Sequence, residues 1–376
     1  MRAIRTTLLL AGVAASAYRS VRSVDRVRRV LALSPVADPG GTDVPVVAVV
    51  PARDEEAVID ACVRGLRAQI HANLRIVVVD DASADATGEI ARRHAAEDAR
   101  VSVVRTSGPP PGWKGKVHAM HAGVVAAGDF PGSAWLLFVD ADVVLGPQAL
   151  GRLLTTARDA RADLVSSPAG PPAGRSLTWP VLVPPSIQMI GENADPQGRG
   201  RKAFAIGHCI LVHAGAYEVV GGWAALRNLR NEDIALATAV RDRGGVTRLV
   251  DGLAHVTTSG MDPWTQGWTS FRKSFVAGTR GSVPVLLGGG LGQIALSLAP
   301  PAAALLGRRH VRLAGLAGWA LQAIAHRRAA RLMRAGSWGA PLAPVASALF
   351  GGVLIDGAVR VVRRTSGWKG RTDRFR

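Results

Sequence analysis

The sequence has little cysteine, and this shortage excludes several classes of protein. Only two cysteines, Cys62 and Cys209, occur in 376 residues. Two are too few for a disulfide scaffold or for a four-cysteine zinc site. We expect both thiols to be buried in a protein of a reducing compartment. Apolar residues make up 48% of the chain and charged residues only 20%, which excludes a disordered protein. The length allows roughly two or three domains.

Acidic residues are also scarce relative to basic ones. Asp and Glu number 28 against 46 Lys and Arg, so the net charge is +18. Such an excess indicates either nucleic acid or an anionic membrane surface as a partner. The mean hydropathy of +0.17 favours the membrane. No nucleic-acid-binding module is recognisable and much of the charge flanks hydrophobic runs, so we expect no nucleic-acid partner.

The N-terminus carries a short hydrophobic run. Residues 6–18 lack charge, but a spanning helix needs about 17–25 residues. A signal peptide is the alternative, because Ala15-Ser16-Ala17 resembles a cleavage site. Five arginines follow the run at once, and the positive-inside rule keeps such a flank in the cytoplasm. We therefore expect residues 1–30 to form an uncleaved anchor or an interfacial helix.

The C-terminal part contains longer hydrophobic runs. Residues 283–306 lack charge and are long enough to span a membrane, and residues 338–355 are a second candidate. The basic flanks at 326–334 and 360–376 are both expected on the inner side. We expect residues 281–360 to form membrane-spanning or re-entrant helices, with a basic tail at 361–376. A large buried helical core is the alternative.

Between the hydrophobic ends, short apolar runs alternate with helical patterns. The runs predicted as strands are 44–51, 74–83, 100–106 and 133–143, and the predicted helices are 54–72, 115–128 and 145–160. Fully apolar short strands that alternate with helices indicate an α/β doubly wound unit with a mostly parallel sheet. Such sheets bind ligands beyond the carboxyl ends of their strands. Functional residues should therefore follow each apolar run.

Acidic clusters stand at three of these strand ends. They are Asp54-Glu55-Glu56, Asp80-Asp81 and the pair formed by Asp140 and Asp142. Helix N-capping is the alternative for each cluster. Carboxylates at a strand end beside a nucleotide crevice suit Mg²⁺ or Mn²⁺, which prefer oxygen ligands and substrate phosphates.

A Gly/Pro loop over 108–113 leads into a helix that carries Lys114 and Lys116, two of only five lysines. Backbone amides at a helix start together with ammonium groups favour a phosphate. An ordinary turn is the alternative. Residues 368–370 nearly repeat the Trp-Lys-Gly of this loop, so the tail could also contact phosphate or instead lie on a membrane surface. His118 and His121 are three residues apart, but we expect them to be core or surface residues.

The ordered motifs resemble the inverting family 2 glycosyltransferases, which have the GT-A fold. The motifs are PARDEE (51–56), VVVDDASAD (77–85), GWKGK (112–116), FVDADV (138–143), NED (231–233) and GWTSFRKSF (267–275). The set is similar to membrane-anchored bacterial members, such as hopanoid-associated and carotenoid (diaponeurosporenoate-type) glycosyltransferases. The resemblance covers residues 44–280, with a nucleotide-sugar half at 44–143 and an acceptor half at 144–280.

The resemblance implies a role for each motif. Asp233 would be the general base, beside Glu232, and Asp142 the better metal ligand, beside Asp140. A helix start is the alternative for 231–233, with Asn231 as its cap. The residues expected to bind the nucleotide sugar, from the motifs and the resemblance together, are Pro51, Ala52, Arg53, Glu55, Asp80, Asp81, Lys114, Lys116, Asp140, Arg272 and Lys273.

These features predict a glycosyltransferase that moves a sugar from a nucleotide sugar, a UDP-sugar rather than a GDP-sugar, to a membrane lipid at the cytoplasmic face of the inner membrane. The apolar segment 179–193 favours an isoprenoid, carotenoid, hopanoid or glycerolipid acceptor. A processive polysaccharide synthase is the second hypothesis. Its Q-x-x-R-W motif is absent, since Gln266, Trp268 and Arg272 are spaced differently. An inactive membrane-anchored sugar-nucleotide sensor is the third.

Overall fold

The structure is a computed structural model that describes residues 2–30, 34–35, 38, 43–172, 176–191, 203–229, 231–260, 262–363, 367–368 and 371–372. Contacts divide the chain into two compact units. We call Leu33–Pro172 with Ala194–Ser259 the sheet unit, and Met1–Ala32 with Ala173–Asn193 and Gly260–Arg376 the helical unit. Two stretches that we assigned to the acceptor half, 173–193 and 260–280, thus group with the helices.

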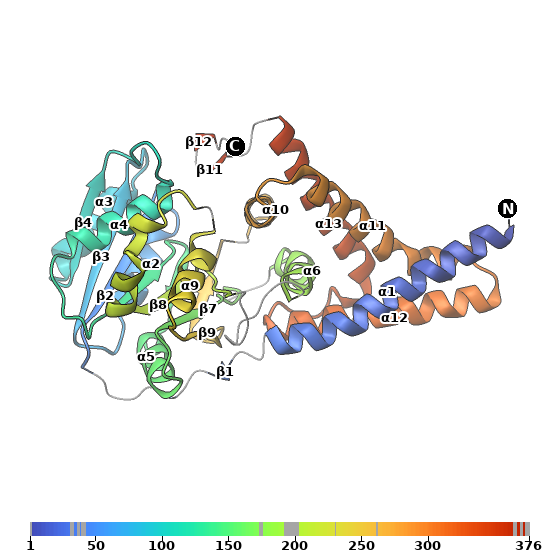
Figure 1. The fold of residues 1–376 in the computed structure, drawn as a ribbon, viewed down its shortest axis with the longest axis horizontal. Coiled ribbons are helices and arrows are strands. Elements are labelled where there is room, and N and C mark those ends of the chain that lie inside the picture. Colours follow the sequence, from blue (N-terminus) through green and yellow to red (C-terminus); the bar gives the residue numbers. More distant parts are fainter. Residues whose placement is uncertain are drawn as a thin grey trace. The chain divides into compact units, whose positions relative to one another are not determined.

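The sheet unit contains one large sheet, shown in Figure 1. Its eight described strands stand in the order β1-β9-β7-β8-β5-β2-β3-β4. Their bounds are β1 Ser34–Pro35, β2 Val46–Ala52, β3 Leu74–Asp81, β4 Val101–Thr106, β5 Trp135–Val139, β7 Leu164–Ser167, β8 Cys209–His213 and β9 Thr247–Asp251. Strand β8 runs antiparallel to both its neighbours, β5 and β7, and the other pairs are parallel. The predicted mostly parallel sheet is confirmed.

Helices cover both faces of this sheet, as a doubly wound unit requires. Helices α2 (Ile59–Arg67), α3 (Thr87–Glu97) and α5 (Ala149–Asp159) share one hydrophobic core with one face. Helices α4 (Gly115–Ala126), α7 (Ala214–Val220), α8 (Gly222–Ala225) and α9 (Glu232–Asp242) share a second core with the other face. The predicted helix 145–160 starts later, because residues Val143–Leu145 form β6 and pair with β10 (Val256–Thr258).

A glycine sets the approach of α4 to the sheet. A Cβ atom on Gly123 would lie 2.4 Å from Val49 Cγ1 and 2.9 Å from Val79 Cγ2. Glycine at this position therefore lets α4 pack directly on β2 and β3. This packing places Lys116, in the first turn of α4, near the carboxyl ends of the strands.

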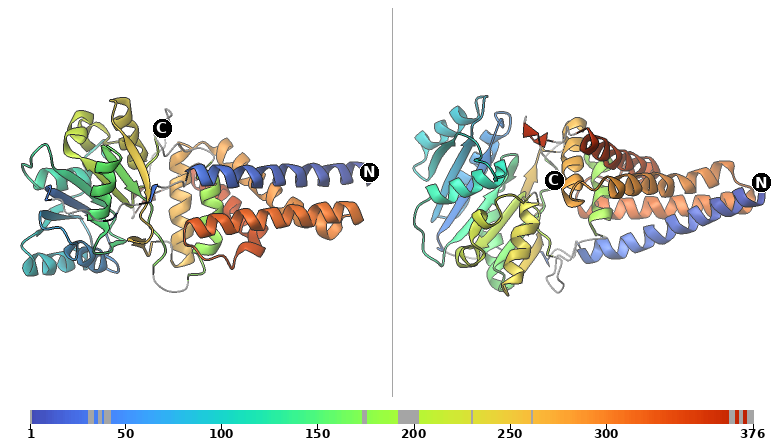
Figure 2. Two further views of the ribbon diagram at one scale, coloured as in Figure 1. Left: turned by 90° about the horizontal axis from the view of Figure 1, so that it is seen from below. Right: turned by 45° about the horizontal axis from the view of Figure 1, so that its top comes forward.

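The helical unit contains α1 (Arg2–Val30), α6 (Trp179–Gly191), α10 (Trp264–Gly278), α11 (Val283–Leu306), α12 (Arg309–Leu332), the short 3-10 helix η1 (Ala340–Leu342) and α13 (Ala343–Val362). Helix α1 lies along α11 and α12, as Figure 2 shows for α1 and α12. Two segments, Val283–Leu306 and Ala340–Val362, are long and apolar enough to cross a membrane. A short β11 (Gly367–Trp368) pairs with β12 (Arg371–Thr372), and most of the predicted basic tail, including Lys369, lies outside the described residues.

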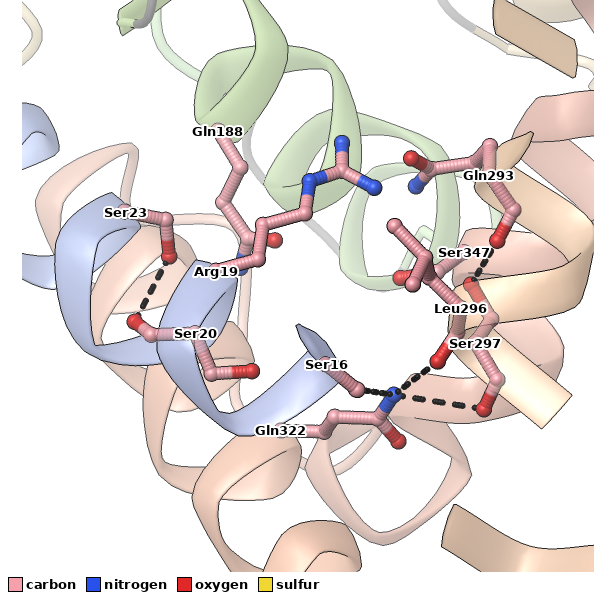
Figure 3. Close-up of a pocket in the computed structure, with 10 residues that line it drawn as sticks. All are labelled: Ser16, Arg19, Ser20, Ser23, Gln188, Gln293, Leu296, Ser297, Gln322 and Ser347. Carbon is pink, nitrogen blue, oxygen red and sulfur yellow. Dashed lines mark hydrogen bonds between the residues drawn. The ribbon is translucent and has the colours of Figure 1, made fainter. Parts of the chain in front are cut away.

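Both α6 and α11 contain a pair of prolines, Pro184-Pro185 and Pro300-Pro301. Proline has no backbone N–H, so each pair leaves carbonyl groups one turn earlier without a helical partner. Side chains of α12 take the place of the missing donors. The Nε2 atom of Gln322 lies 3.2 Å from the carbonyl oxygens of both Leu296 and Ser297 (Figure 3). His326 Nε2 lies 2.7 Å from the carbonyl oxygen of Pro180.

Candidate functional site

The acidic residues that the sequence singled out stand at the carboxyl ends of the central strands of the sheet unit. Asp80 and Asp81 end β3, and Ala52, which ends β2, pairs with Asp80. Asp140 follows β5 directly, and Asp142 directly precedes β6. Since β2, β3 and β5 are parallel neighbours, these ends share one edge of the sheet, as predicted.

Lys116 joins two of the predicted groups. Its Nζ atom lies 2.7 Å from Asp140 Oδ1 and 2.8 Å from Glu232 Oε1. Although burial opposes the charge, the two carboxylates hold the pKa of Lys116 well above its ordinary value. The side chain is 25% exposed, so the ammonium group keeps some access to solvent. The Lys116 ammonium group therefore lies between Asp140, a predicted metal ligand, and Glu232 of the predicted catalytic pair.

Asp233 lies beside this cation at the start of α9. Its Oδ2 accepts a hydrogen bond of 3.0 Å from the backbone N–H of Gly207, and its Oδ1 accepts one of 2.8 Å from Ile234. Burial, and then the neighbouring charge of Glu232, raise the pKa of Asp233 to about 7, against the opposing effect of Lys116. A carboxylate with a pKa near the operating pH suits a general base.

Asp142 directly precedes β6, which forms a two-stranded antiparallel sheet with β10. Its Oδ2 accepts a hydrogen bond of 3.1 Å from the Thr258 hydroxyl. Its Oδ1 has no hydrogen-bond or ion-pair partner among the described residues, so one carboxylate oxygen remains for a cation. The described part of the chain holds no group of three or more His, Cys, Asp or Glu that could complete a metal site. A two-carboxylate set fits Mg²⁺ or Mn²⁺ if substrate phosphates and water supply the other ligands.

The loops after β2 and β3 are joined to each other by reciprocal hydrogen bonds. The side chains of Asp54 and Glu56 accept from the backbone N–H groups of Ala84 and Ala86. In return, the Ser83 hydroxyl accepts from the backbone N–H of Asp54. The helix-capping alternative is wrong for the acidic residues of these two loops, because no side chain caps the N-terminus of α2 or α3. Asp54 and Ala82 have positive φ angles of 51° and 55°. Non-glycine residues keep this unfavourable conformation only where the surrounding contacts hold the loop in place.

The predicted nucleotide-binding residues around β3 have partners inside this loop region. Asp80 is 0% exposed, and it accepts hydrogen bonds from Ser83 N (2.9 Å) and Arg105 Nη1 (2.7 Å). Asp81 accepts from the Thr106 hydroxyl (2.7 Å). These contacts help to fix the conformation of the loops, and the contact of both carboxylates with the nucleotide sugar stays a prediction.

The remaining predicted donor-binding residues are spread over both units. Pro51 ends β2 with Ala52, and Arg53 lies between Asp54 and Asp81, with Nη1 3.3 Å from the carbonyl oxygen of Asp81. The backbone N–H of Glu55 donates to the Thr87 hydroxyl (2.7 Å). Lys114 precedes α4, and its N–H donates to the Arg227 carbonyl (2.7 Å). Arg272 and Lys273 belong to α10 in the helical unit, where Arg272 forms an ion pair of 2.8 Å with Asp356.

The histidines and cysteines of the sheet unit that the sequence singled out have packing roles. His118 and His121 pack against Trp113, with ring centroids 5.6 Å and 4.9 Å apart. Cys62 and Cys209 are free and buried, as expected. Asn231 occupies the N-cap position of α9, but its side chain makes no capping hydrogen bond.

Sequence reasoning missed three participants. Gly207 and His208 contribute backbone atoms, the N–H bonded to Asp233 and the carbonyl that accepts from Asp140 N (3.2 Å). No side-chain pattern could have identified them. Thr258 lies far from Asp142 in the sequence, and only the pairing of β6 with β10 brings the two together.

Comparison with known proteins agrees with this geometry. Residues 47–221 match the family described as Glycosyl transferase family 2. Two Bacillus subtilis (strain 168) proteins that are named as glycosyltransferases are similar to this chain: EpsH is 33% identical over 111 residues and EpsJ, named as uncharacterized, is 29% identical over 117 residues. The matched regions cover 29% and 31% of this chain, and the same shares of the two relatives. The chain therefore matches less than a third of either protein.

A solved structure shares the fold over nearly the whole chain. The mannosyltransferase PcManGT from Pyrobaculum calidifontis, in complex with GDP-Man and Mn²⁺, matches with a TM-score of 0.61 and 17% sequence identity. The match covers 95% of this chain and 98% of that one. At this identity the likeness shows the fold alone. Residues 47–221 are thus similar to family 2 glycosyltransferases, and the chain has the mostly parallel α/β GT-A fold.

Proposed function

We propose that this protein is an inverting glycosyltransferase that moves a sugar from a nucleotide sugar to a membrane lipid at the cytoplasmic face of the inner membrane. The observation that carries the proposal is the arrangement around Lys116. One ammonium group contacts Asp140 on one side and Glu232 on the other, with Asp233 adjacent. A single inverting displacement needs a base at one end and charge stabilisation at the other, and this cluster offers both.

In the proposed reaction Asp233 acts as the general base. Asp233 takes the proton of the acceptor hydroxyl group while the acceptor oxygen attacks the anomeric carbon of the sugar. The bond between that carbon and the diphosphate oxygen breaks at the same time. The backbone N–H groups of Gly207 and Ile234 orient the carboxylate. The configuration at the anomeric carbon inverts because only one displacement occurs.

The leaving nucleoside diphosphate carries the charge that the site must stabilise. Asp142 and Asp140 would hold a divalent cation there, and the presence of Mn²⁺ in the structure of PcManGT supports this assignment. A bound Mg²⁺ or Mn²⁺ neutralises charge on the departing diphosphate. We keep Lys114 and the loop residues Ala52, Arg53 and Glu55 as the donor side of the site.

The lipid acceptor is proposed from the helical unit. Two helices can cross a membrane by length and composition, and α6, the apolar segment proposed for the acceptor, belongs to the same unit. Arginine-rich stretches flank these helices, which supports a cytoplasmic catalytic domain. A UDP-sugar stays our predicted donor, although the complex of PcManGT contains GDP-Man, so the test includes both nucleotides.

Transfer in isolated membranes tests the proposal. Labelled UDP-glucose, UDP-galactose, UDP-N-acetylglucosamine and GDP-mannose are supplied in turn with Mn²⁺ or Mg²⁺ and a lipid extract of the host. We expect label in the lipid fraction that requires the metal and is lost in Asp233→Asn. Asp242→Asn, an exposed acid at the end of the same helix, is the matched control and should keep full transfer.

The other outcomes support the competing hypotheses. Label in an insoluble polymer would favour a processive synthase. Metal-dependent nucleotide binding without transfer to any fraction would favour a sugar-nucleotide sensor. Full transfer by both Asp233→Asn and Asp142→Ala would contradict the assignment of the site.

A further inference from the structure

The imidazole ring of His208 lies at the edge of the sheet that holds the candidate site, and the proposed transfer gives it no role. His208 directly precedes β8, and its carbonyl oxygen accepts from the backbone N–H of Asp140 (3.2 Å). The preceding residue is as close to the site, since a Cβ atom on Gly207 would lie 3.2 Å from Lys116 Nζ and 3.5 Å from Asp233 Oδ2. His208 is therefore a direct neighbour of the site's charged groups.

The ring of His208 is held from the opposite side by the segment after β7. Its Nδ1 atom accepts a hydrogen bond of 3.2 Å from the backbone N–H of Ala169. The next residue, Gly170, accepts through its carbonyl oxygen from the backbone N–H of Thr258 (3.0 Å). The hydroxyl of Thr258 in turn donates to Asp142. The ring is thus anchored between the strand end that carries Asp140 and the segments that support Asp142.

The contact with Ala169 fixes which ring nitrogen of His208 carries the hydrogen. A nitrogen that accepts from a backbone N–H has no hydrogen of its own, so Nε2 must carry it. Nε2 has no hydrogen-bond partner among the described residues, and it is not fully buried. A histidine that binds a metal through Nε2 needs the opposite tautomer, with the hydrogen on Nδ1. His208 therefore offers an N–H donor to a substrate rather than a lone pair to the cation.

We propose that His208 Nε2 donates a hydrogen bond to the β-phosphate of the nucleotide sugar. The divalent cation that Asp140 and Asp142 would hold neutralises the same diphosphate, so phosphate oxygens are the acceptors that this part of the site receives. When the bond to the anomeric carbon breaks, its electron pair stays on the diphosphate oxygen. An N–H donor placed beside this growing charge stabilises the transition state, and the hydrogen stays on His208. The inference rests on the proposed function and adds a residue to its donor side.

Isothermal titration calorimetry of the full-length protein in detergent tests the contact without requiring transfer. UDP and UMP, and then GDP and GMP, are titrated in the presence of Mn²⁺. For each base, the ratio of the two dissociation constants isolates the contribution of the β-phosphate. We expect the wild type to prefer a diphosphate, and His208→Ala to reduce this preference about tenfold, as for a lost hydrogen bond to a charged group. An unchanged preference would overturn the proposal. A misfolded fraction would lower the bound amount of both nucleotides and leave the ratio unaltered.

Two further variants separate the hydrogen bond from a general effect of losing a histidine. His208→Gln should retain most of the preference, because the glutamine amide also carries an N–H donor. His213→Ala is the matched control, because His213 stands at the other end of β8, where its ring packs against Trp135 with centroids 5.2 Å apart. This control should keep the full preference for the diphosphate. Equal losses in His208→Ala and His213→Ala would overturn the proposal.

Two other readouts distinguish this proposal from its alternatives. In pulsed EPR of the bound Mn²⁺, a coupling to an imidazole nitrogen that disappears in His208→Gln would make the ring a metal ligand and overturn the proposal. We expect no such coupling. A wild type that binds the diphosphate but transfers no sugar would contradict the transferase proposal. A reduced preference in His208→Ala would still support the diphosphate contact in that case, so the two failures are distinguishable.

Discussion

The side-chain amide of Gln322 occupies the place of the backbone N–H that Pro300 lacks. In an unbroken helix the residue at position 300 would donate to the carbonyl of Leu296, and Gln322 Nε2 lies 3.2 Å from that oxygen instead. His326 lies one turn further along α12, and its Nε2 atom contacts the carbonyl oxygen of Pro180. In an unbroken α6 this oxygen would accept from the N–H that Pro184 lacks. One polar strip on α12 therefore completes the hydrogen bonding of two proline-containing helices, which is how such helices are tolerated in an apolar environment.

Replacing Gln322 with leucine should destabilise the helical unit. The carbonyls of Leu296 and Ser297 would lose their donor, at a cost of about 1–3 kcal/mol. Thermal unfolding of the detergent-solubilised protein measures the effect. In a Pro300→Ala background the helix supplies its own N–H to Leu296, so Gln322→Leu should cost clearly less there. The same decrease in Tm in both backgrounds would show that Gln322 does not compensate for the proline.

Replacing Lys116 with methionine should reduce both activity and stability. Asp140 and Glu232 would lose the cation that each now contacts, so we expect kcat/KM for the donor to fall by about two orders of magnitude, as for a lost electrostatic contact in a site. Stability should fall by roughly 1–3 kcal/mol, discounted for the partial exposure of the pair. Steady-state kinetics and thermal unfolding measure the two effects.

A second variant separates the two consequences of losing Lys116. Adding Glu232→Gln to Lys116→Met removes one of the unpaired charges and should recover most of the Tm. It should not recover kcat/KM. Recovery of activity together with stability would mean that Lys116 acts on the fold alone.

The raised pKa of Asp233 predicts the pH dependence of the reaction. A general base must be ionised, so kcat/KM should rise with pH and level off above the pKa of about 7. A profile that is flat from pH 5 to 8 would rule out Asp233 as the titrating base. The charged groups that face Asp233 are Glu232 and Lys116, so Glu232→Gln should move the midpoint downward.

The same pKa predicts an opposite trend for stability. The folded state holds the Asp233 proton more tightly than the unfolded state, whose carboxyl has a pKa of about 3.9. The free energy of unfolding should therefore decrease as the pH rises from about 4 to 7, and this loss should then level off. Asp233→Asn removes the effect, so the variant should exceed the wild type in Tm at pH 8 and gain less at pH 4. Equal Tm differences at the two pH values would contradict the shift.

Replacing Gly123 with alanine should disturb the sheet unit. The new methyl group would meet Val49 and Val79 at distances shorter than real Cβ contacts, and overpacking of this kind costs roughly 1–3 kcal/mol. Gly132→Ala is the control, because nothing lies within 4 Å of a Cβ atom there. Chemical denaturation of both variants measures the difference, and equal midpoints would contradict the close packing of α4.

The sheet could be predicted because its strands are buried on both faces. Runs such as the one ending at Pro51 are apolar throughout, which distinguishes them from amphipathic helices. The carboxyl-end rule then placed Asp80, Asp140 and Asp142 at one edge, as the structure does. These inferences use only local composition and a general property of parallel sheets.

Contacts between distant segments could not be predicted in this way. The carboxylates of Asp54 and Glu56 resemble helix caps in sequence, yet they bond backbone groups of the loop after β3. Lys116 was predicted to bind phosphate from its place at a helix start, but its ion pairs depend on how α4 and α9 meet the sheet. Segment 179–193 was predicted only as an apolar acceptor segment, and the contact of His326 with the Pro180 carbonyl of its helix α6 joins residues far apart in the sequence.

The reversed direction of β8 has a consequence for how this site can change. A parallel strand brings to the active edge the residues that follow it, whereas β8 brings those that precede it, residues 203–208. This stretch supplies the N–H that orients Asp233 and the carbonyl that accepts from Asp140, both through the main chain. Neither contact uses a side chain, whereas Ala203 and Ala205 are buried in the second core and the His208 ring accepts from the backbone N–H of Ala169. Substitutions at the partly exposed Phe204 and Ile206 would therefore change this entering segment and leave the parallel core that holds the carboxylates unaltered.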